Sequence, residues 1–150
     1  MTVKEHYKQA LLWDKMADDK VSCKLCNWRC KIANGNVGYC AVRKNVDGTL
    51  YSLNYHRVCS ANPDPIEKKP LFHFLPGTRS MSVATAGCNF QCEFCQNWRI
   101  SQGPRDGSGI EGRAVSPEQT VTGAINHDCA SISYTDTEPT VFFELAYETA

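Results

Sequence analysis

The chain has 150 residues, of which 42% are hydrophobic, and its 16 Lys and Arg residues balance its 16 Asp and Glu residues to a formal net charge of zero. The length suits a single domain, and the hydrophobic content argues against general disorder. A neutral chain lacks the positive excess that dedicated nucleic-acid or anionic-membrane binders carry. No apolar run approaches the ~18–20 residues of a membrane span, and the polar amino terminus is unlike a signal peptide, so we expect a cytoplasmic protein.

The first part of the chain is predicted to form a helix, a loop-rich region and a strand. Residues 4–20 place Tyr7 and Leu11 at helical spacing, which is typical of an amphipathic helix. Residues 22–47 are rich in turn signals and contain two glycines. Residues 50–58 alternate loosely in polarity and follow an Asp-Gly turn, so we expect a strand there.

Prolines indicate a division of the chain. The segment Asn62-Pro63-Asp64-Pro65 interrupts the strand pattern, and Pro70 and Pro76 bracket a short apolar stretch. We therefore predict a boundary near Pro76. Residues 1–76 would form the amino-terminal helix and a cysteine-rich metal-binding region, and residues 77–150 a second unit.

From Ser80 onward the pattern is that of an α/β protein. A helix start is predicted at Ser116, an N-cap residue that is followed by Pro117 and, three residues after the cap, by Gln119. Two strands joined through a helix form a βαβ unit, whose strands lie parallel in one sheet. The expected elements are a buried strand at 81–86, a glycine-rich loop at 103–112, a helix at 116–126, a strand at 130–134 and a helix that begins at 140.

The chain holds nine cysteines, an odd number that cannot be fully paired within one chain. A reducing compartment disfavours disulfides, so metal or iron–sulfur ligation is the better interpretation. Most of the cysteines fall into two clusters. The first consists of Cys23, Cys26, Cys30 and Cys40, and the second of Cys88, Cys92 and Cys95.

The second cluster has the spacing C-x3-C-x2-C. Three thiolates on one loop can hold three corners of an iron–sulfur cluster, which leaves the fourth iron open to a substrate or cofactor. Structural zinc needs a fourth ligand, for which His127 and Cys129 are only remote candidates. Ordinary buried cysteines are the third interpretation.

At this cluster the sequence resembles the radical S-adenosylmethionine (SAM) superfamily, whose signature is C-x3-C-x-aromatic-C, with Phe94 as the aromatic residue. It is most similar to the radical SAM members of the AmmeMemoRadiSam system, relatives of pyruvate formate-lyase activating enzymes. Those proteins usually carry an aromatic residue where this chain has Asp136. The resemblance covers nearly the whole chain and rests on segments 23–26, 64–71, 95–98 and 134–140.

The resemblance implies a radical SAM reaction. Cys88, Cys92 and Cys95 would ligate three irons of a [4Fe–4S] cluster, and the open iron would chelate the amino and carboxylate groups of SAM. One electron from the reduced cluster would cleave SAM to methionine and a 5′-deoxyadenosyl radical, which abstracts a hydrogen atom from the substrate. A reductant such as flavodoxin or ferredoxin is implied as a partner, together with a protein or small-molecule substrate.

The resemblance also implies two cofactor-binding residues and a fold. Phe94 would pack beside the cluster and the adenine of SAM. Glu138, just past the second predicted strand, would accept a charge-assisted hydrogen bond from the SAM ammonium group, at the carboxyl end of a parallel strand where α/β folds bind ligands. The implied fold class is α/β, the first βαβ portion of a partial (β/α)6 radical SAM barrel, preceded by a small cysteine-rich metal-binding region.

The first cluster, with the spacing C-x2-C-x3-C-x9-C, provides four thiolates in a loop-rich region. Four thiolates suit either tetrahedral zinc or a fully ligated auxiliary iron–sulfur cluster, and the spacing does not choose between them. Such a site would stabilise a small region with little core of its own.

Two further expectations concern the function class and the extent of the chain. The alternative to a radical SAM enzyme is a non-catalytic iron–sulfur or zinc module for electron transfer or metal binding, which has no use for a carboxylate at Glu138. A zinc-finger-like nucleic-acid binder is disfavoured by the zero net charge. Superfamily barrels usually have six βα units, so we expect this chain to be the amino-terminal part of a longer enzyme, with weak or no activity alone.

Overall fold

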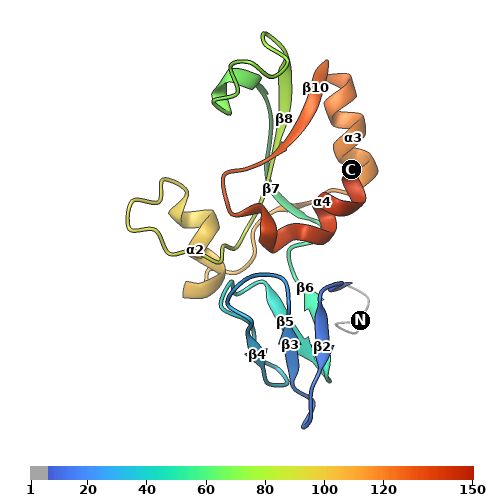
Figure 1. Cartoon of the computed structure of the whole chain (residues 1–150), viewed down its shortest axis with the longest axis vertical. Coiled ribbons are helices and arrows are strands. Elements are labelled where there is room, and N and C mark those ends of the chain that lie inside the picture. Colours follow the sequence, from blue (N-terminus) through green and yellow to red (C-terminus); the bar gives the residue numbers. More distant parts are fainter. Residues whose placement is uncertain (1–6) are drawn as a thin grey trace.

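The structure is a computed structural model that describes residues 7–150. It contains two small antiparallel sheets and one larger mixed sheet. In Figure 1 the small sheets form the lower part of the molecule, and the mixed sheet with helices α3 and α4 forms the upper part.

The two small sheets contain the first six strands. One has the order β1 (Lys8–Gln9), β6 (Thr49–Ser52), β5 (Arg43–Val46), and the other the order β2 (Trp13–Lys15), β3 (Val21–Cys23), β4 (Lys31–Ile32). The expected turn between β5 and β6 is confirmed, because Asp47 and Gly48 both have positive φ angles, of 51° and 72°. A small core joins the sheets through the buried residues Ala10, Val21, Cys23, Ile32 and Leu50.

The helix predicted for residues 4–20 is wrong within the described part of the chain, and its residues 4–6 lie outside that part. Strands β1 and β2 occupy the segment instead. The backbone N–H of Ala10 donates to the carbonyl of Leu50 at 2.9 Å, whereas Leu11 is 50% exposed. Strand partners supply the backbone hydrogen bonds here, and such tertiary pairing overrides helical periodicity.

The mixed sheet has the order β10 (Cys129–Tyr134), β8 (Arg79–Thr85), β7 (Arg57–Pro65), β9 (Arg113–Ala114). Helices α3 (Pro117–Asn126) and α4 (Phe143–Thr149) pack beside it (Figure 1). Met81 and Val83 of β8 lie in the core with Phe142 and Leu145. The predicted strands at 81–86 and 130–134 and the helix at 116–126 are thus confirmed, with α3 carrying the full capping box of Ser116 and Gln119.

The topology nevertheless overturns the predicted fold class, the first portion of a partial (β/α)6 barrel. Strand β10 does lie parallel to β8, as the βαβ pattern predicts. The other neighbour of β8 is β7, however, which runs antiparallel to both β8 and β9. A βα barrel needs parallel neighbours on both sides of each strand. Residues 7–150 therefore form antiparallel and mixed sheets with no closed barrel.

Strand β7 runs through the prolines that were expected to end it. Strand β9 pairs only with Arg57 and Val58, so the rest of β7 has a free edge opposite β8. Pro63 and Pro65 lack an N–H but are tolerated on such an edge. Residue 76 lies in the connection between β7 and β8, which also contains a short 3₁₀ helix, η1 (Ile66–Lys68), so the predicted boundary falls between two paired strands of one sheet.

Helix α2 (Trp98–Asp106) takes up the first residues of the glycine-rich loop predicted at 103–112, including Gly103 and Pro104, and residues 107–112 form the connection to β9. Pro104 has no N–H to donate to the carbonyl of Ile100, four residues earlier. That carbonyl accepts the backbone N–H of Gly87 at 2.8 Å instead. The proline therefore frees an acceptor that ties α2 to the end of β8.

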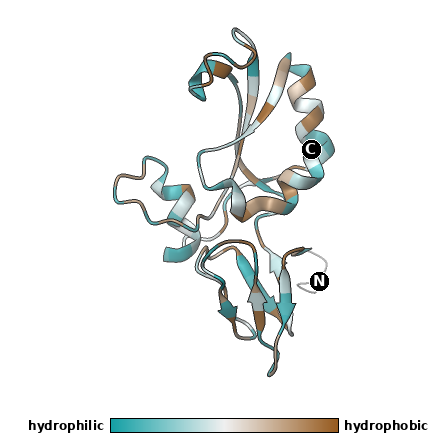
Figure 2. Cartoon of the chain, viewed as in Figure 1, coloured by the Kyte–Doolittle hydropathy of each residue, from teal (hydrophilic) through white to brown (hydrophobic). Residues whose placement is uncertain are grey.

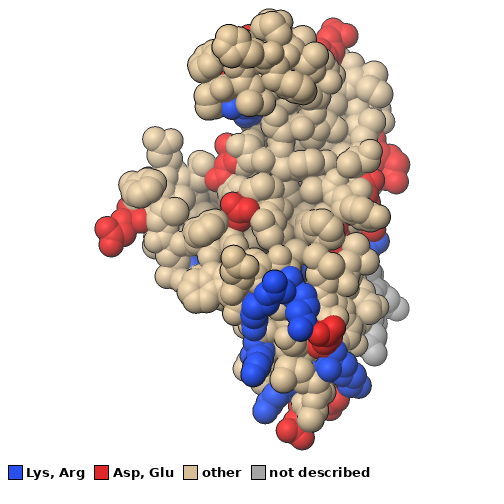
Figure 3. Space-filling view, viewed as in Figure 1, with Lys and Arg blue, Asp and Glu red and all other residues tan. Residues whose placement is uncertain are grey.

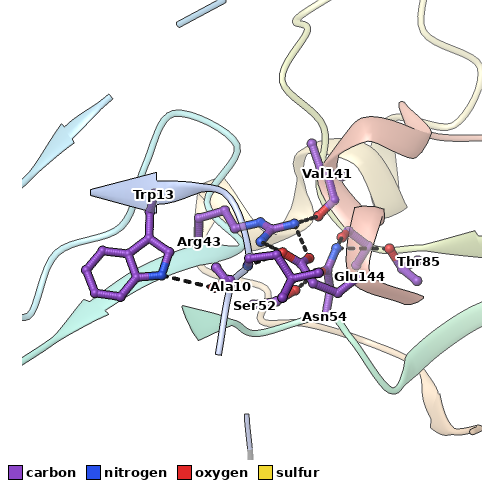
Figure 4. Close-up of polar contacts among 10 residues, drawn as sticks. Ala10, Trp13, Arg43, Ser52, Asn54, Thr85, Val141 and Glu144 are labelled. Carbon is purple, nitrogen blue, oxygen red and sulfur yellow. Dashed lines mark hydrogen bonds and ion pairs between the residues drawn. The ribbon is translucent and has the colours of Figure 1, made fainter. Parts of the chain in front are cut away.

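A buried ion pair joins the two parts of the molecule (Figure 4). Arg43 of β5 is 1% exposed, and Glu144 of α4 is 0% exposed. The guanidinium donates to both carboxylate oxygens, at 2.7 and 2.5 Å, and to the carbonyl of Val141 at 3.1 Å. Val141 belongs to η2 (Pro139–Phe142), a 3₁₀ turn that leads into α4. The backbone N–H of Leu11 also donates to Glu144, at 3.0 Å, whereas the Nε of Arg43 has no hydrogen-bond partner among the described residues.

Figure 2 shows hydrophobic and hydrophilic residues interleaved through the elements. Among residues 7–150, no helix combines the length and the apolar character that crossing a membrane requires.

We predict that breaking the ion pair destabilises the whole described fold. Arg43→Met leaves the Glu144 carboxylate buried without its partner, which costs about 3–5 kcal/mol. Urea unfolding should show this loss, and the double variant Arg43→Met/Glu144→Leu should recover most of it. Arg99→Met is the matched control, because the Arg99–Glu111 pair is exposed and should change the midpoint little. Equal effects of Arg43→Met and Arg99→Met would contradict this assignment.

Candidate functional site

The loop of the second cysteine cluster follows the end of β8. Gly87 opens it with a φ of 98°, a conformation that favours glycine. Cys88 is buried, Cys95 half-buried and Cys92 exposed. Cys88 Sγ accepts the N–H of Phe90 at 3.4 Å, and the N–H of Cys95 donates to the carbonyl of Cys92 at 3.1 Å. The three thiols thus share one tightly turned loop.

Three free cysteine thiols are the type of ligand that iron–sulfur clusters use, so the residues of this loop suit such a cluster chemically. Among the described residues 7–150, however, no three His, Cys, Asp or Glu side chains are gathered closely enough to hold a metal ion. Ligation by Cys88, Cys92 and Cys95 would therefore need the loop to draw its thiols together.

The four cysteines of the first cluster lie around β3 and β4. Burial raises the pKa of Cys23, and it raises the pKa of Cys40 to about 11, while nearby Arg43 lowers both. Charge on Cys30 raises the pKa of both thiols as well. Cys26 acts on Cys23 in the same way. None of the four thiols is in a disulfide. As at the Cys88 loop, no three of them are gathered closely enough within residues 7–150 to hold a metal ion, so ligation would need them to move together.

The surface around the first cluster is basic, because Lys24, Arg29 and Lys31 are all exposed there. Figure 3 shows Lys and Arg gathered over the lower part of the molecule, where β2, β3 and β4 lie. Lys24 pairs with Asp14 at 2.9 Å. Arg43, which also counts among these basic neighbours in the sequence, is instead buried against Glu144.

The loops of the two cysteine clusters contact each other directly. Trp28, from the first, donates its indole N–H to the carbonyl of Asn89 at 2.9 Å. Tyr39 donates its hydroxyl to the side chain of Gln91 at 2.8 Å. The rings of Trp28 and Tyr39 are stacked, with centroids 3.7 Å apart. The cysteine-rich region is therefore part of the same site as the Cys88–Cys95 loop.

Helix α2 also holds this loop. Arg105 donates to the carbonyls of Tyr39 and Cys88, the latter at 3.4 Å, and its guanidinium lies 4.5 Å from the Tyr39 ring centroid. Gln102 donates to the carbonyl of Phe90 at 2.9 Å. The backbone carbonyls that follow Cys88 are thus fixed by side chains from two separate elements.

A cleft of about 490 Å³ lies where these segments meet. Its size is within the ordinary range for small-molecule sites, about 300–1,000 Å³. The lining side chains come from three parts of the chain, and they are Leu25, Cys26, Asn27, Trp28, Asn89, Phe90, Glu138 and Thr140. The structure therefore brings Glu138 beside the Cys88 loop, although the two are far apart in the sequence.

Glu138 caps the 3₁₀ turn η2. Its Oε1 accepts the hydroxyl of Thr140 at 2.6 Å and the backbone N–H of Thr140 at 3.4 Å. Before it, Asp136 has a φ of 65°, in the left-handed region that Asp tolerates better than an aromatic residue. The side chain of Asn97 donates to the carbonyl of Asp136 at 2.9 Å, and Thr137 donates to the carbonyl of Thr85 at 2.9 Å. These bonds hold the Glu138 loop against the end of β8.

Phe94 does not line the cleft and is 87% exposed. Trp28 and Asn89, by contrast, line it but were not singled out from the sequence. The available signal was a tryptophan between Cys26 and Cys30, in a loop with little core to bury it.

The chain is 49% identical over 143 residues to an uncharacterized protein of Methanocaldococcus jannaschii. The match covers 95% of this chain and 42% of that relative, so the chain spans less than half the length of the protein it resembles. No protein-family model matches the chain. No solved structure matches it either.

Gly87→Ala should weaken the contact between the two cysteine regions. A Cβ there would lie 2.5 and 2.8 Å from the methyl groups of Val42 and 3.2 Å from the carbonyl of Cys40. We expect a loss of roughly 2–4 kcal/mol in urea unfolding, from the left-handed backbone and the overpacking together. Gly77→Ala is the matched control, because Gly77 has a φ of 78° and nothing within 4 Å. An equal loss in both variants would show that Gly87 makes no close contact.

Cys59, which lies outside both clusters, should react slowly with alkylating agents. Burial raises its pKa to about 11, and its thiol donates to the carbonyl of Ala84 at 3.4 Å. In the reduced, metal-free protein at pH 8.5, mass spectrometry should find iodoacetamide on exposed Cys92 well before Cys59. The stability gained by keeping this thiol protonated is present below about pH 8.5 and is lost as the pH rises towards 11. Equal alkylation rates at the two cysteines would contradict this.

Proposed function

We propose that this chain is a radical SAM enzyme or its amino-terminal part, with Cys88, Cys92 and Cys95 as cluster ligands. The observation that supports it most is the shared cleft. Glu138 lines this cleft together with Asn89 and Phe90, which directly follow Cys88. A loop with three free thiols and a carboxylate on the adjoining cleft are the two features that this chemistry needs from the protein.

When bound, a reduced [4Fe–4S] cluster supplies the electron that cleaves SAM to methionine and a 5′-deoxyadenosyl radical, which takes a hydrogen atom from the substrate. The protein contributes binding, orientation and exclusion of water. Cys88, Cys92 and Cys95 would serve as thiolates. The exposure of Cys92 leaves their loop accessible to a reductant such as flavodoxin or ferredoxin.

Glu138 would accept the ammonium group of SAM. Its Oε1 is engaged by Thr140, and no hydrogen bond to its Oε2 is found among the described residues. A carboxylate held in this way offers Oε2 to a cationic donor without having to reorganise. Phe94, which is 87% exposed, has an open ring against which the adenine would pack.

The first cluster, Cys23, Cys26, Cys30 and Cys40, would hold zinc or an auxiliary iron–sulfur cluster. The support for a common ligand is that all four thiols are free and closely spaced in the sequence around β3 and β4, because a cation removes the repulsion between thiolates. Nine free cysteines suit the reducing cytoplasm, where we place the protein.

Spectroscopy of the reconstituted chain tests the proposal. After anaerobic loading with iron and sulfide and reduction with dithionite, we expect an electron paramagnetic resonance signal that SAM alters. Cys92→Ala should lose the SAM-responsive signal, whereas Cys129→Ala, outside both clusters, should keep it. Glu138→Gln should weaken the response to SAM about tenfold or more, as expected for a lost charge-assisted hydrogen bond. Glu111→Gln, an exposed acid outside the cleft, should leave the response unchanged.

Formation of 5′-deoxyadenosine is the second readout. The proposal is wrong if SAM does not change the signal, if Cys92→Ala gives the same signal as the parent, and if no 5′-deoxyadenosine forms. A stable cluster with reversible reduction and no response to SAM would instead identify a non-catalytic electron-transfer module.

A further inference from the structure

Trp28 is an aromatic platform on the wall of the cleft. One face of its indole is stacked on Tyr39, with centroids 3.7 Å apart and an interplanar angle of 19°. Trp28 is still 52% exposed and lines the cleft. Because the Tyr39 ring covers one face of the Trp28 indole, the exposed surface of Trp28 must be the other face and the edge. An open indole face therefore borders the cleft.

This platform is held rigidly. The indole N–H of Trp28 donates to the carbonyl of Asn89 at 2.9 Å, and the hydroxyl of Tyr39 donates to Gln91 at 2.8 Å. The Arg105 guanidinium lies 4.5 Å from the centroid of the Tyr39 ring. A ring fixed from its edge and from behind loses little freedom when a ligand stacks on it, which is the usual advantage of a preorganised site.

The rest of the cleft provides an aromatic side chain and an unpaired polar atom. Phe90 lines the cleft and is 54% exposed, with its carbonyl anchored by Gln102. Asn89 is only 7% exposed, yet its Oδ1 is buried without a hydrogen-bond partner. A buried acceptor without a partner is unfavourable, and a donor on a ligand would remove that cost after a small rotation of the side chain.

The composition of the lining narrows the chemistry of the ligand. It contains no Lys, Arg or His, so nothing in it favours a phosphate or a carboxylate. Under the proposed function Glu138 takes the ammonium group of SAM and Phe94 its adenine. Trp28, Phe90 and the Asn89 amide are left for a second ligand.

We propose that this cleft binds the substrate through a flat aromatic ring that carries a hydroxyl or amide donor, stacked on Trp28 with its donor at Asn89 Oδ1. The assignment of this ligand as the substrate rests on the proposed function. The ring site itself does not, because it follows from the stacking, exposure and unpaired acceptor alone.

The test compares two probes that differ only in the ring. Equilibrium dialysis of the full chain with 4-hydroxybenzamide and with trans-4-hydroxycyclohexanecarboxamide measures the two affinities. Both carry a hydroxyl and an amide, but only the first is flat. The chain should bind the flat probe roughly fivefold or more tightly, the expected gain from one aromatic pair.

Substitutions locate the binding. Trp28→Leu should remove the preference for the flat ring, and Trp28→Phe should keep most of it. Trp98→Leu is the matched control, because Trp98 is 53% exposed and lies outside the cleft, and it should keep the full preference. Circular dichroism checks that each variant folds.

Equal affinity for the two probes, or no binding of either, overturns the inference without any variant. An equal loss in Trp28→Leu and Trp98→Leu overturns it too. If Trp28→Leu does not fold, magnetisation transfer between the probe ring and the Trp28 indole in the parent protein decides, and its absence refutes the site.

The outcomes also separate this inference from the proposed function. A cluster that responds to SAM, in a chain that shows no preference for the flat probe, refutes this inference alone. A ring preference with no SAM response refutes the proposed function and leaves the ring site standing.

Discussion

The architecture depends on the buried ion pair between Arg43 and Glu144. It joins a strand of the small sheets to the last helix of the mixed sheet, and both side chains are shielded from solvent. Two buried charges are tolerated only when their remaining donors and acceptors are nearly all paired. The carbonyl of Val141 and the N–H of Leu11 meet most of that requirement. The pair therefore favours the arrangement in which β5 of the cysteine-rich region lies against α4, because losing either partner would leave a buried charge uncompensated.

That docking gives the cleft its composition. Trp28 comes from the loop between β3 and β4, and Glu138 from the connection that leads into α4, so neither part of the molecule forms the cleft alone. Val141, which accepts from Arg43, follows Glu138 by one turn of η2. The contact that fixes the two parts thus also fixes the position of the proposed SAM-binding carboxylate. The cysteine-rich region therefore supplies part of the wall of the cleft.

Local signals predicted the elements that carry them within the chain. The capping box at Ser116 placed α3, and the run of small and apolar residues at 81–86 placed β8. Strand β1 was missed because its partner, β6, is distant in the sequence. Strand β7 and helix α2 were missed because their own segments contain Pro63, Gly103 and Pro104, residues that are unfavourable inside a strand or a helix. Pro63 is compatible with a strand only on a free edge, and an edge is a property of the whole sheet. The barrel prediction also failed because strand pairing is a property of the whole sheet. Nothing in the residues of β8 indicates that its neighbour β7 runs antiparallel to it.

The candidate site was likewise predictable only in part from the sequence. Cysteine spacing predicted which thiols share a loop, whereas the stack of Trp28 on Tyr39 appears only in three dimensions. The loop after Cys88 has one more mechanical property. The successive carbonyls of Cys88, Asn89 and Phe90 each accept a side-chain donor, from Arg105, Trp28 and Gln102 respectively. None of these three donors belongs to the loop or is a cysteine. The backbone of the loop is therefore held from outside, and a single cysteine can be replaced without removing the contacts that shape its neighbours.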